Sequence, residues 1–187
     1  MISTQYFIDA TKGNQNLAIC ICDLIKIKIG EVATLLKNQL KQALQTAEGL
    51  YYRLVLLVGE AGAGKTSLLQ TLAQELETEV ININLALSTE LLELSTKQRA
   101  LALPERLAQV VEKTKPLLLL DNLEILFDKH LQQDALKLLQ GLSRNSTVVA
   151  SWNGKLLVDK LIYAEAGHPE YRSYELNDLL IIDLNTP

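Results

Sequence analysis

Arg53-Leu-Val-Leu-Leu-Val-Gly59-Glu-Ala-Gly-Ala-Gly64-Lys65-Thr66 is the stretch on which the fold of this chain depends. Its first part is a short, almost unbroken apolar run, which is typical of a strand buried on both faces. Its second part matches G-x-x-x-x-G-K-[ST] at every fixed position, and residues 66–76 then have the apolar spacing of a helix. Strand, glycine-rich turn and helix in this order predict a P-loop, in which backbone N–H groups wrap a phosphate.

The P-loop indicates which residues hold a nucleoside triphosphate, and we expect ATP with Mg²⁺. Lys65 would reach the β- and γ-phosphates, and the Thr66 hydroxyl would bind Mg²⁺. No N-K-x-D signature of guanine binding occurs in the chain, which disfavours GTP. The residues of this segment expected to contact the nucleotide are Gly59, Glu60, Ala61, Gly62, Ala63, Gly64, Lys65, Thr66 and Ser67.

An acidic residue follows a second apolar run. Leu117-Leu-Leu-Leu120-Asp121 places a carboxylate directly after four leucines, where an ionised group needs a partner. A hydrated cation supplies one, so we predict that Asp121 is the Walker B acid and binds Mg²⁺ together with Thr66. A helix-capping aspartate is the alternative interpretation.

The residues that would carry out hydrolysis are less clearly marked. Many ATPases place Glu directly after the Walker B aspartate to polarise water, but position 122 here is Asn. The nearest acid is Glu124, which is either the catalytic acid or a surface charge. Asn153 would sense the γ-phosphate, and Arg144 would act as an arginine finger on a neighbouring subunit. For both, an ordinary surface or turn residue is the alternative.

Strands and helices alternate along the chain, which predicts a parallel sheet covered by helices on both faces. After the P-loop helix we expect strands at 80–84, 117–120, 147–151 and 179–184, and helices at 104–112 and 131–140. The predicted fold class is α/β, a P-loop NTPase three-layer sandwich with a mainly parallel five-stranded sheet. Between the two Walker strands the sequence offers one more strand, 80–84, and if a strand separates them in the sheet the layout resembles the RecA and AAA+ side of P-loop NTPases. No separate AAA+ lid domain is expected.

The domain organisation follows from a change of pattern near residue 31. Residues 31–49 have the spacing of an amphipathic helix, and we expect the P-loop domain to cover residues 31–187. Residues 1–30, with alternating isoleucines, form an N-terminal extension of uncertain role.

Composition narrows the function classes. A formal charge of −4 argues against a wholly basic surface for nucleic acid, and 48% hydrophobic residues exclude a disordered chain. Two cysteines, Cys20 and Cys22, exclude a disulfide framework and a four-cysteine zinc site. No signal peptide or membrane-spanning run is visible, so we expect a cytoplasmic protein.

Two further groups of side chains are candidate surfaces. Arg99 and Arg106 with Lys97 form a basic cluster, for which a solvated helix face is favoured over a DNA surface. The segment 163–174 is rich in tyrosine, and we expect a loop there that either docks a partner or packs on the sheet.

Five short sequence segments are similar to those of a known family. They are Tyr51–Gly59, Asp121–Phe127, Gly141–Asn145, Ala150–Gly154 and Tyr163–Tyr171. Together they resemble the BrxF family, the small P-loop proteins of type 3 bacteriophage exclusion (BREX) systems. The resemblance implies a cytosolic prokaryotic defence protein that works beside a DNA methyltransferase, a helicase and other BREX subunits. Direct contact with DNA and self-association stay open.

Three functional hypotheses remain at this point. The first is an ATP-binding, ATP-hydrolysing subunit of a BREX assembly. The second is a scaffold that holds ATP without turnover, which the missing Asp-Glu pair favours. The third is a small-molecule kinase, although the sequence contains no arginine-rich lid.

Overall fold

The computed structural model describes residues 32, 34–112 and 116–185. The chain divides into two units, Met1–Asn38 and Gln39–Pro187, and the sheet lies wholly within the second. The expected extension, residues 1–30, lies outside the described residues together with Cys20 and Cys22. The domain boundaries therefore stay a prediction.

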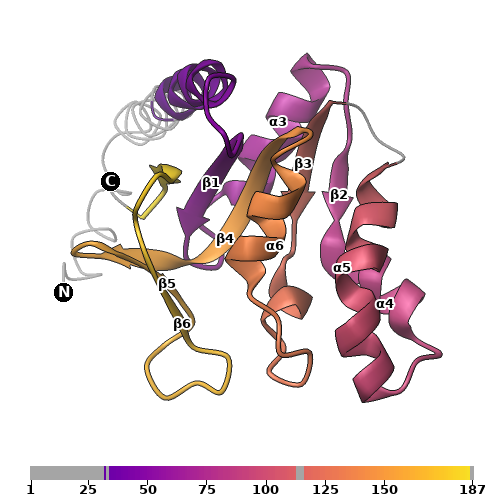
Figure 1. Cartoon of the computed structure of the whole chain (residues 1–187). Helices are drawn as coiled ribbons and strands as arrows, with labels where there is room; N and C mark the ends of the chain where they lie inside the picture. Colours follow the sequence, from indigo (N-terminus) through magenta and orange to yellow (C-terminus); the bar gives the residue numbers. More distant parts are fainter. Residues whose placement is uncertain (1–31, 33, 113–115, 186–187) are drawn as a thin grey trace, which may run out of the picture. The chain divides into compact units, whose positions relative to one another are not determined.

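A parallel sheet forms the centre of the second unit (Figure 1). Its neighbouring strands run in the order β2-β3-β4-β1-β7, and each adjacent pair in this series is parallel. The bounds are β1 Leu54–Gly59, β2 Val80–Asn82, β3 Leu117–Asp121, β4 Thr147–Leu157 and β7 Leu180–Asp183. The predicted α/β class and parallel sheet are confirmed. A strand does separate the two Walker strands β1 and β3, but it is β4; β2, which lies between them along the chain, is at the edge.

Helices cover the two faces of this sheet. They are α3 Lys65–Glu75, α4 Ile83–Leu91, α5 Thr96–Glu112, the 3-10 helix η2 Glu124–Phe127 and α6 Ala135–Leu142. Figure 1 shows α3 behind the sheet and α5 and α6 in front of it. A further helical stretch covers residues 34–47, across the boundary between the two units. None of the helices in the described part of the chain is long and apolar enough to span a membrane.

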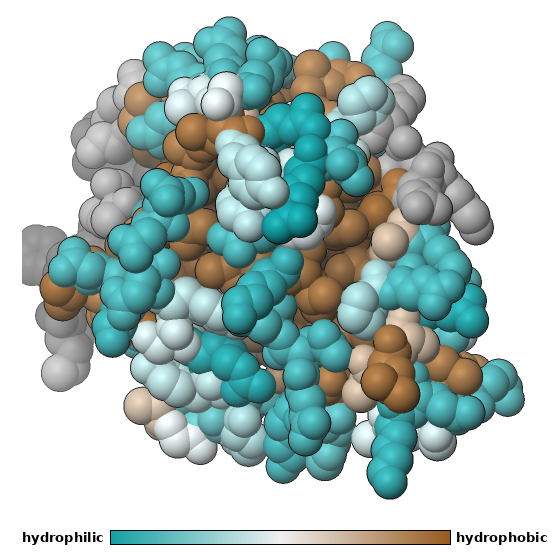
Figure 2. Space-filling model, in the orientation of Figure 1, coloured by the Kyte–Doolittle hydropathy of each residue, from teal (hydrophilic) through white to brown (hydrophobic). Residues whose placement is uncertain are grey.

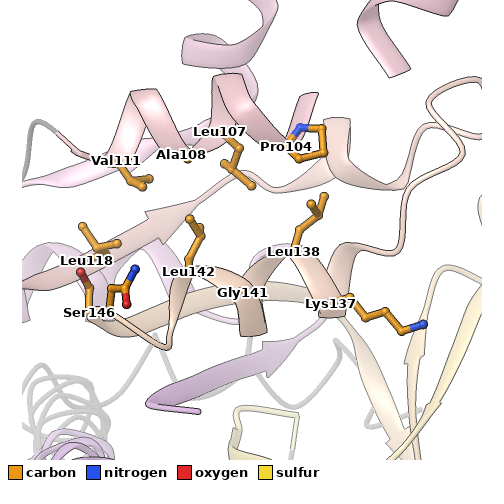
Figure 3. Close-up of a pocket in the computed structure, with 11 residues that line it drawn as sticks. Pro104, Leu107, Ala108, Val111, Leu118, Lys137, Leu138, Gly141, Leu142 and Ser146 are labelled. Atoms are coloured by element: carbon orange, nitrogen blue, oxygen red, sulfur yellow. The ribbon is translucent and has the colours of Figure 1, made fainter. Parts of the chain in front are cut away.

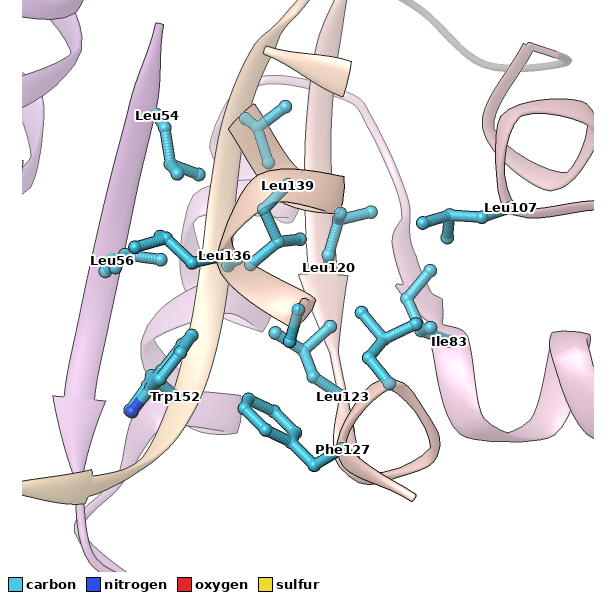
Figure 4. Close-up of a cluster of buried hydrophobic side chains, with 14 of the residues drawn as sticks. Leu54, Leu56, Ile83, Leu107, Leu120, Leu123, Phe127, Leu136, Leu139 and Trp152 are labelled. Carbon is cyan, nitrogen blue, oxygen red and sulfur yellow. The ribbon is translucent and has the colours of Figure 1, made fainter. Parts of the chain in front are cut away.

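The front face of the sheet carries the larger part of the core. Alternate residues of β1, Leu54, Leu56 and Val58, join one buried cluster with residues of the helices in front of the sheet. Figure 4 shows leucines of α6 over β1 and β4, with Trp152 and Phe127 close together below them. All six residues of β1 are buried, which confirms the expectation from the apolar run. The strand before the P-loop is thus fixed by packing on both faces.

The strand predicted at 80–84 is too long. It ends at Asn82, whose side-chain Oδ1 accepts a hydrogen bond of 2.9 Å from the N–H of Leu85 and caps α4. Ile83 and Leu87 are then buried at helical spacing. Helix α4 was not predicted because apolar residues in a short segment fit a strand as well as a helix.

The helix predicted at 104–112 begins earlier, at Thr96, so that Pro104 lies inside it. A proline within a helix leaves the carbonyl four residues before it without its usual donor. That carbonyl, on Ala100, accepts a hydrogen bond of 2.8 Å from Nε2 of Gln133. A distant side chain therefore replaces the missing backbone donor. The helix predicted at 131–140 begins only at Ala135, after Asp134 as its cap.

An antiparallel extension continues from the carboxyl-terminal half of β4, where the sequence predicts a loop. Strand β5 (Lys160–Tyr163) pairs with β4, and β6 (Arg172–Glu175) pairs with β5. The Tyr163 ring stacks on Phe127 with centroids 3.5 Å apart, and Trp152 packs edge-on against Phe127 at 5.0 Å. Tyr174 also packs on Trp152, at 5.6 Å. Tyr163 therefore belongs to the core and joins η2 to the extension, and the partly buried Tyr174 packs against the same core.

Gly154 permits the close approach of β4 and β5, and this gives a test of the packing. A Cβ at Gly154 would collide with the carbonyl oxygen of Ile162, whereas a Cβ at Gly141 in α6 would meet no heavy atom within 4 Å. We expect Gly154→Ala to lower the unfolding free energy by about 1–3 kcal/mol. Gly141→Ala, the matched control, should raise it by about 0.5–1 kcal/mol because alanine favours a helix. Thermal unfolding measures both, and a Gly154→Ala protein as stable as the wild type would contradict the packing described.

Candidate functional site

The glycine-rich turn leaves the carboxyl end of β1 in a conformation that requires glycine at two positions. Gly62 and Gly64 have φ of +85° and +91°, and Gly64 is also the N-cap residue of α3. A Cβ at either would meet no heavy atom within 4 Å, so side chains are excluded by backbone strain and not by crowding. The space in front of the turn is open, as phosphate binding requires.

Lys65 lies in this turn with its ammonium group directed back at the backbone. The side chain is 7% exposed, and Nζ donates to the carbonyl oxygens of Gly59 at 2.6 Å and Glu60 at 2.7 Å. Burial lowers the pKa of Lys65, and the negative charges of Asp121 and Glu124 partly oppose that shift. Phosphate oxygens could take the place of the two carbonyls as acceptors.

Thr66 and Asp121 come together at the ends of different elements. The Thr66 hydroxyl, in the first turn of α3, donates a hydrogen bond of 2.8 Å to Oδ2 of Asp121 at the end of β3. Asp121 is only 5% exposed. A hydroxyl beside a buried carboxylate is the set of oxygen ligands that Mg²⁺ prefers, so the residues present fit that ion. Of the two interpretations of Asp121, the geometry favours the cation ligand over the helix cap.

A cavity of about 330 Å³ opens between these groups. Its lining comprises Ala61, Gly62, Gly64, Lys65, Thr66, Ser67, Asp121, Asn122 and Asn153. The predicted residues Gly59, Glu60 and Ala63 do not line it, but they shape the loop. The N–H of Ala63 donates to the Glu60 carbonyl at 3.1 Å, and a Cβ at Gly59 would lie 2.8 Å from that of Ala63.

Asn153 and Glu124 form a hydrogen-bonded pair at the carboxyl ends of the strands, beside the P-loop. Asn153 lies in β4 opposite Gly59 of β1, and its Nδ2 donates a hydrogen bond to Oε1 of Glu124, at the start of η2. Glu124 is therefore not an isolated surface charge, since its carboxylate is bonded to a residue that lines the cavity. The two residues were predicted separately from the sequence, and the structure pairs them.

Asn122, directly after the Walker B aspartate, has a conformational reason to be asparagine. Its φ is +55°, a left-handed conformation that Asn adopts more readily than Glu. Its carbonyl accepts a hydrogen bond of 2.9 Å from the N–H of Asn84 at the start of α4. The chain turns sharply here, and the turn places Glu124 where Asn153 can reach it.

Arg144 is not part of this constellation within one chain. It precedes β4, so it lies at the amino-terminal edge of the sheet, whereas the P-loop follows the carboxyl end of β1. Its guanidinium lies 5.4 Å from the ring centroid of Tyr51, and its NH2 donates to the Tyr52 hydroxyl at 3.4 Å. That hydrogen bond raises the pKa of Arg144. The role as an arginine finger in a neighbouring subunit stays a prediction.

A second hollow lies between α5 and α6 and has a different chemistry. Its volume is about 440 Å³, and Leu107, Leu138 and Leu142 are among the apolar side chains that face it (Figure 3). Figure 2, drawn from the same side as Figure 1, shows brown apolar surface open in the middle of this face. Among the described residues, Lys137 is the one charged member of its lining, so this hollow does not resemble a triphosphate site.

Two members of the basic cluster on α5, Arg99 and Arg106, make contacts within the chain. Arg99 donates to the carbonyl oxygens of Leu94 at 2.8 Å and Leu92 at 3.1 Å, and Arg106 lies 3.6 Å from Glu90. These contacts favour a solvated helix face over a DNA surface, as the sequence does.

One polar contact of the site was not predicted. Oδ1 of Asn185, after β7, accepts a hydrogen bond of 2.8 Å from the N–H of Glu60 in the P-loop. No motif marks Asn185. Only the pairing of β7 with β1, which brings residue 185 beside the P-loop, could have indicated it.

A known protein family matches more than half of the chain. The match covers residues 55–163, and the family is described as the ATPase family associated with various cellular activities (AAA). Among solved structures, PCH-2 from C. elegans is similar with a TM-score of 0.40 and 22% identity, over 84% of this chain and 42% of that chain. AMPPCP-bound DnaA from Aquifex aeolicus gives a TM-score of 0.40 and 19% identity, over 79% and 44%. The chain thus spans less than half the length of either. No curated protein sequence matches it.

The two buried charges of the site can be tested by nucleotide binding. We expect Lys65→Ala to weaken binding of a fluorescent ATP analogue by at least about tenfold, because a charge-assisted hydrogen bond is lost. Asp121→Asn keeps an acceptor for Thr66 but loses the charge, so Mg²⁺ should strengthen binding much less than in the wild type. Lys137→Ala removes an exposed lysine outside the cavity and is the control. Unaltered affinity in Lys65→Ala would contradict the assignment.

Proposed function

The chain belongs to the AAA family of ATPases, and from the geometry of its site we propose that it binds ATP with Mg²⁺ and hydrolyses it. The observation that carries this proposal is the hydrogen bond between Thr66 and Asp121 beside an open glycine-rich turn. It supports a site with a phosphate nest on one side and a pair of cation ligands on the other.

Binding follows from groups that are already in place. The first backbone N–H groups of a helix have no partner within the helix, so those at the start of α3, which lines the cavity, can donate to the phosphates. Lys65 exchanges the carbonyls of Gly59 and Glu60 for phosphate oxygens and so keeps acceptors for its ammonium group. Thr66 and Asp121 would hold Mg²⁺, which neutralises charge on the phosphates when it is bound.

Hydrolysis needs a group that orients water and accepts its proton. The carboxylate of Glu124 is the general base in this proposal, because the side-chain amide of Asn122 cannot accept a proton. The side-chain amide of Asn153 has two N–H donors. One already binds Glu124, and the other would contact the γ-phosphate. Asn153 would thereby hold the acid and the phosphate on either side of the attacking water.

A scaffold that holds ATP without turnover is the second candidate function. It is favoured by Asn122, which occupies the position directly after the Walker B aspartate and cannot accept a proton at neutral pH. In this function the nucleotide would order the P-loop and α3 and stabilise the fold by mass action.

We propose further that the chain is the P-loop subunit of a BREX defence system in the cytoplasm. The support is the resemblance of its short strings to the BrxF family. The expected partners are the methyltransferase, the helicase and other subunits of that assembly, and contact with DNA would be made through them.

Glu124 distinguishes the two candidate functions. We expect Glu124→Gln to lower the rate of phosphate release from Mg·ATP by about 10²- to 10⁴-fold, because the general base is lost. ATP affinity should stay the same, since glutamine keeps an acceptor for Asn153. Glu105→Gln, on the surface of α5, is the control. Binding without phosphate release in the wild type as well would favour the scaffold.

The BREX assignment has a test of its own. In a host that carries the other subunits, we expect Lys65→Ala to abolish protection against phage, measured as plating efficiency, while the Lys137→Ala control keeps it. Full protection in the absence of this chain would contradict the assignment.

A further inference from the structure

Asn185 makes hydrogen bonds to residues in, or directly after, three neighbouring strands, β7, β1 and β4, at the end of the sheet where the candidate site lies. Its Oδ1 accepts from the N–H of Glu60 at 2.8 Å, and its Nδ2 donates to the carbonyl oxygen of Gly154 at 3.1 Å. Its own N–H donates to Oδ1 of Asp183 at 2.9 Å. Because one neighbour offers only a donor and the other only an acceptor, the orientation of the amide is unambiguous.

The strand order makes this contact a bridge. β7 lies on one side of β1 and β4 lies on the other. The N–H of Leu184 still donates to the Val58 carbonyl at 2.8 Å, so residues beyond β7 continue along β1 to its end. Asn185 then crosses the end of β1 and reaches β4. One side chain ties the start of the P-loop to the strand that carries Asn153.

The bond to Glu60 also bears on Lys65. The N–H of Glu60 and the carbonyl of Gly59 belong to the same planar peptide group, so fixing one fixes the direction of the other. Asn185 holds the N–H side of this group, and Lys65 donates to the carbonyl side. On the other strand, the Gly154 carbonyl that Asn185 holds follows directly after Asn153, which binds Glu124.

We propose that Asn185 is a positioning residue that couples the phosphate-binding lysine to the Asn153–Glu124 pair. This rests on the proposed ATP site. When Lys65 leaves the loop carbonyls for phosphate, Asn185 keeps the Gly59–Glu60 peptide from rotating, and the loop stays in its binding conformation. The same side chain extends the contact between β1 and β4 by one residue beyond the Gly59–Asn153 pair, and so helps to hold the distance between the γ-phosphate and Glu124.

Two substitutions separate the two arms of the bridge. Asn185→Ala removes both, so we expect ATP affinity and the rate constant of hydrolysis each to fall by about three- to tenfold, the equivalent of one hydrogen bond. Asn185→Asp keeps the acceptor for Glu60 but loses the donor to Gly154. With its added charge screened by salt, affinity should stay near that of the wild type while hydrolysis falls as in Asn185→Ala. Asn145→Ala, at the opposite edge of the sheet, is the control.

A double-mutant cycle tests whether Asn185 acts through Asn153. We expect the double variant Asn153→Ala, Asn185→Ala to have the same rate constant of hydrolysis, at saturating ATP, as Asn153→Ala alone. Multiplied effects would overturn the coupling, and so would a lower melting temperature with unchanged affinity and rate in both Asn185 variants. Failure of the wild type to bind ATP would overturn the proposed function itself. If the wild type binds without turnover, unchanged affinity in Asn185→Ala overturns the inference, and weakened affinity supports it.

Discussion

Lys65 and Asp121, 7% and 5% exposed, share one small cavity at the carboxyl ends of β1 and β3, two apolar strands on either side of β4. Desolvating two charges is costly unless each is hydrogen-bonded, and the neighbouring structure supplies such bonds to both. The P-loop carbonyls accept from Lys65, and the Thr66 hydroxyl donates to Asp121. These bonds depend on the glycine conformations of the P-loop, on the position where α3 starts, and on the position of β3 in the sheet.

Much of the fold could be predicted because each buried strand is a short apolar run that ends in a distinctive residue. The exceptions have local causes. The strand at 80–84 was predicted too long because its apolar residues continue into α4, where the Asn82 cap decides the boundary. The extension of β5 and β6 was missed because its strands have only four residues each, too few to show a period, and nothing in the sequence marks its tyrosines as buried. Only contact with Phe127 and Trp152 places them at the core.

The candidate site divides in the same way. Lys65, Thr66 and Asp121 could be found because the chemistry of a triphosphate demands those residue types at fixed places. Asn153 and Glu124 were predicted one at a time, and their pairing depends on β4 and η2 meeting in space. Arg144 lies at the amino-terminal ends of the strands, away from the P-loop, because it precedes β4 and the strands are parallel. The residue type alone does not indicate this position. Asn185 has no signal without the β1–β7 pairing.

Pro104 has a consequence for the order in which the molecule folds. Because Pro104 has no N–H, the carbonyl of Ala100 gains a donor from the protein when Gln133, 33 residues away, is in place. The middle of α5 therefore cannot complete its hydrogen bonding as an isolated segment. Its completion waits for a non-local contact, which ties a local element to the slower assembly of the chain around β3 and α6. Complete hydrogen bonding of α5 is thus a property of the whole domain and not of the helix sequence.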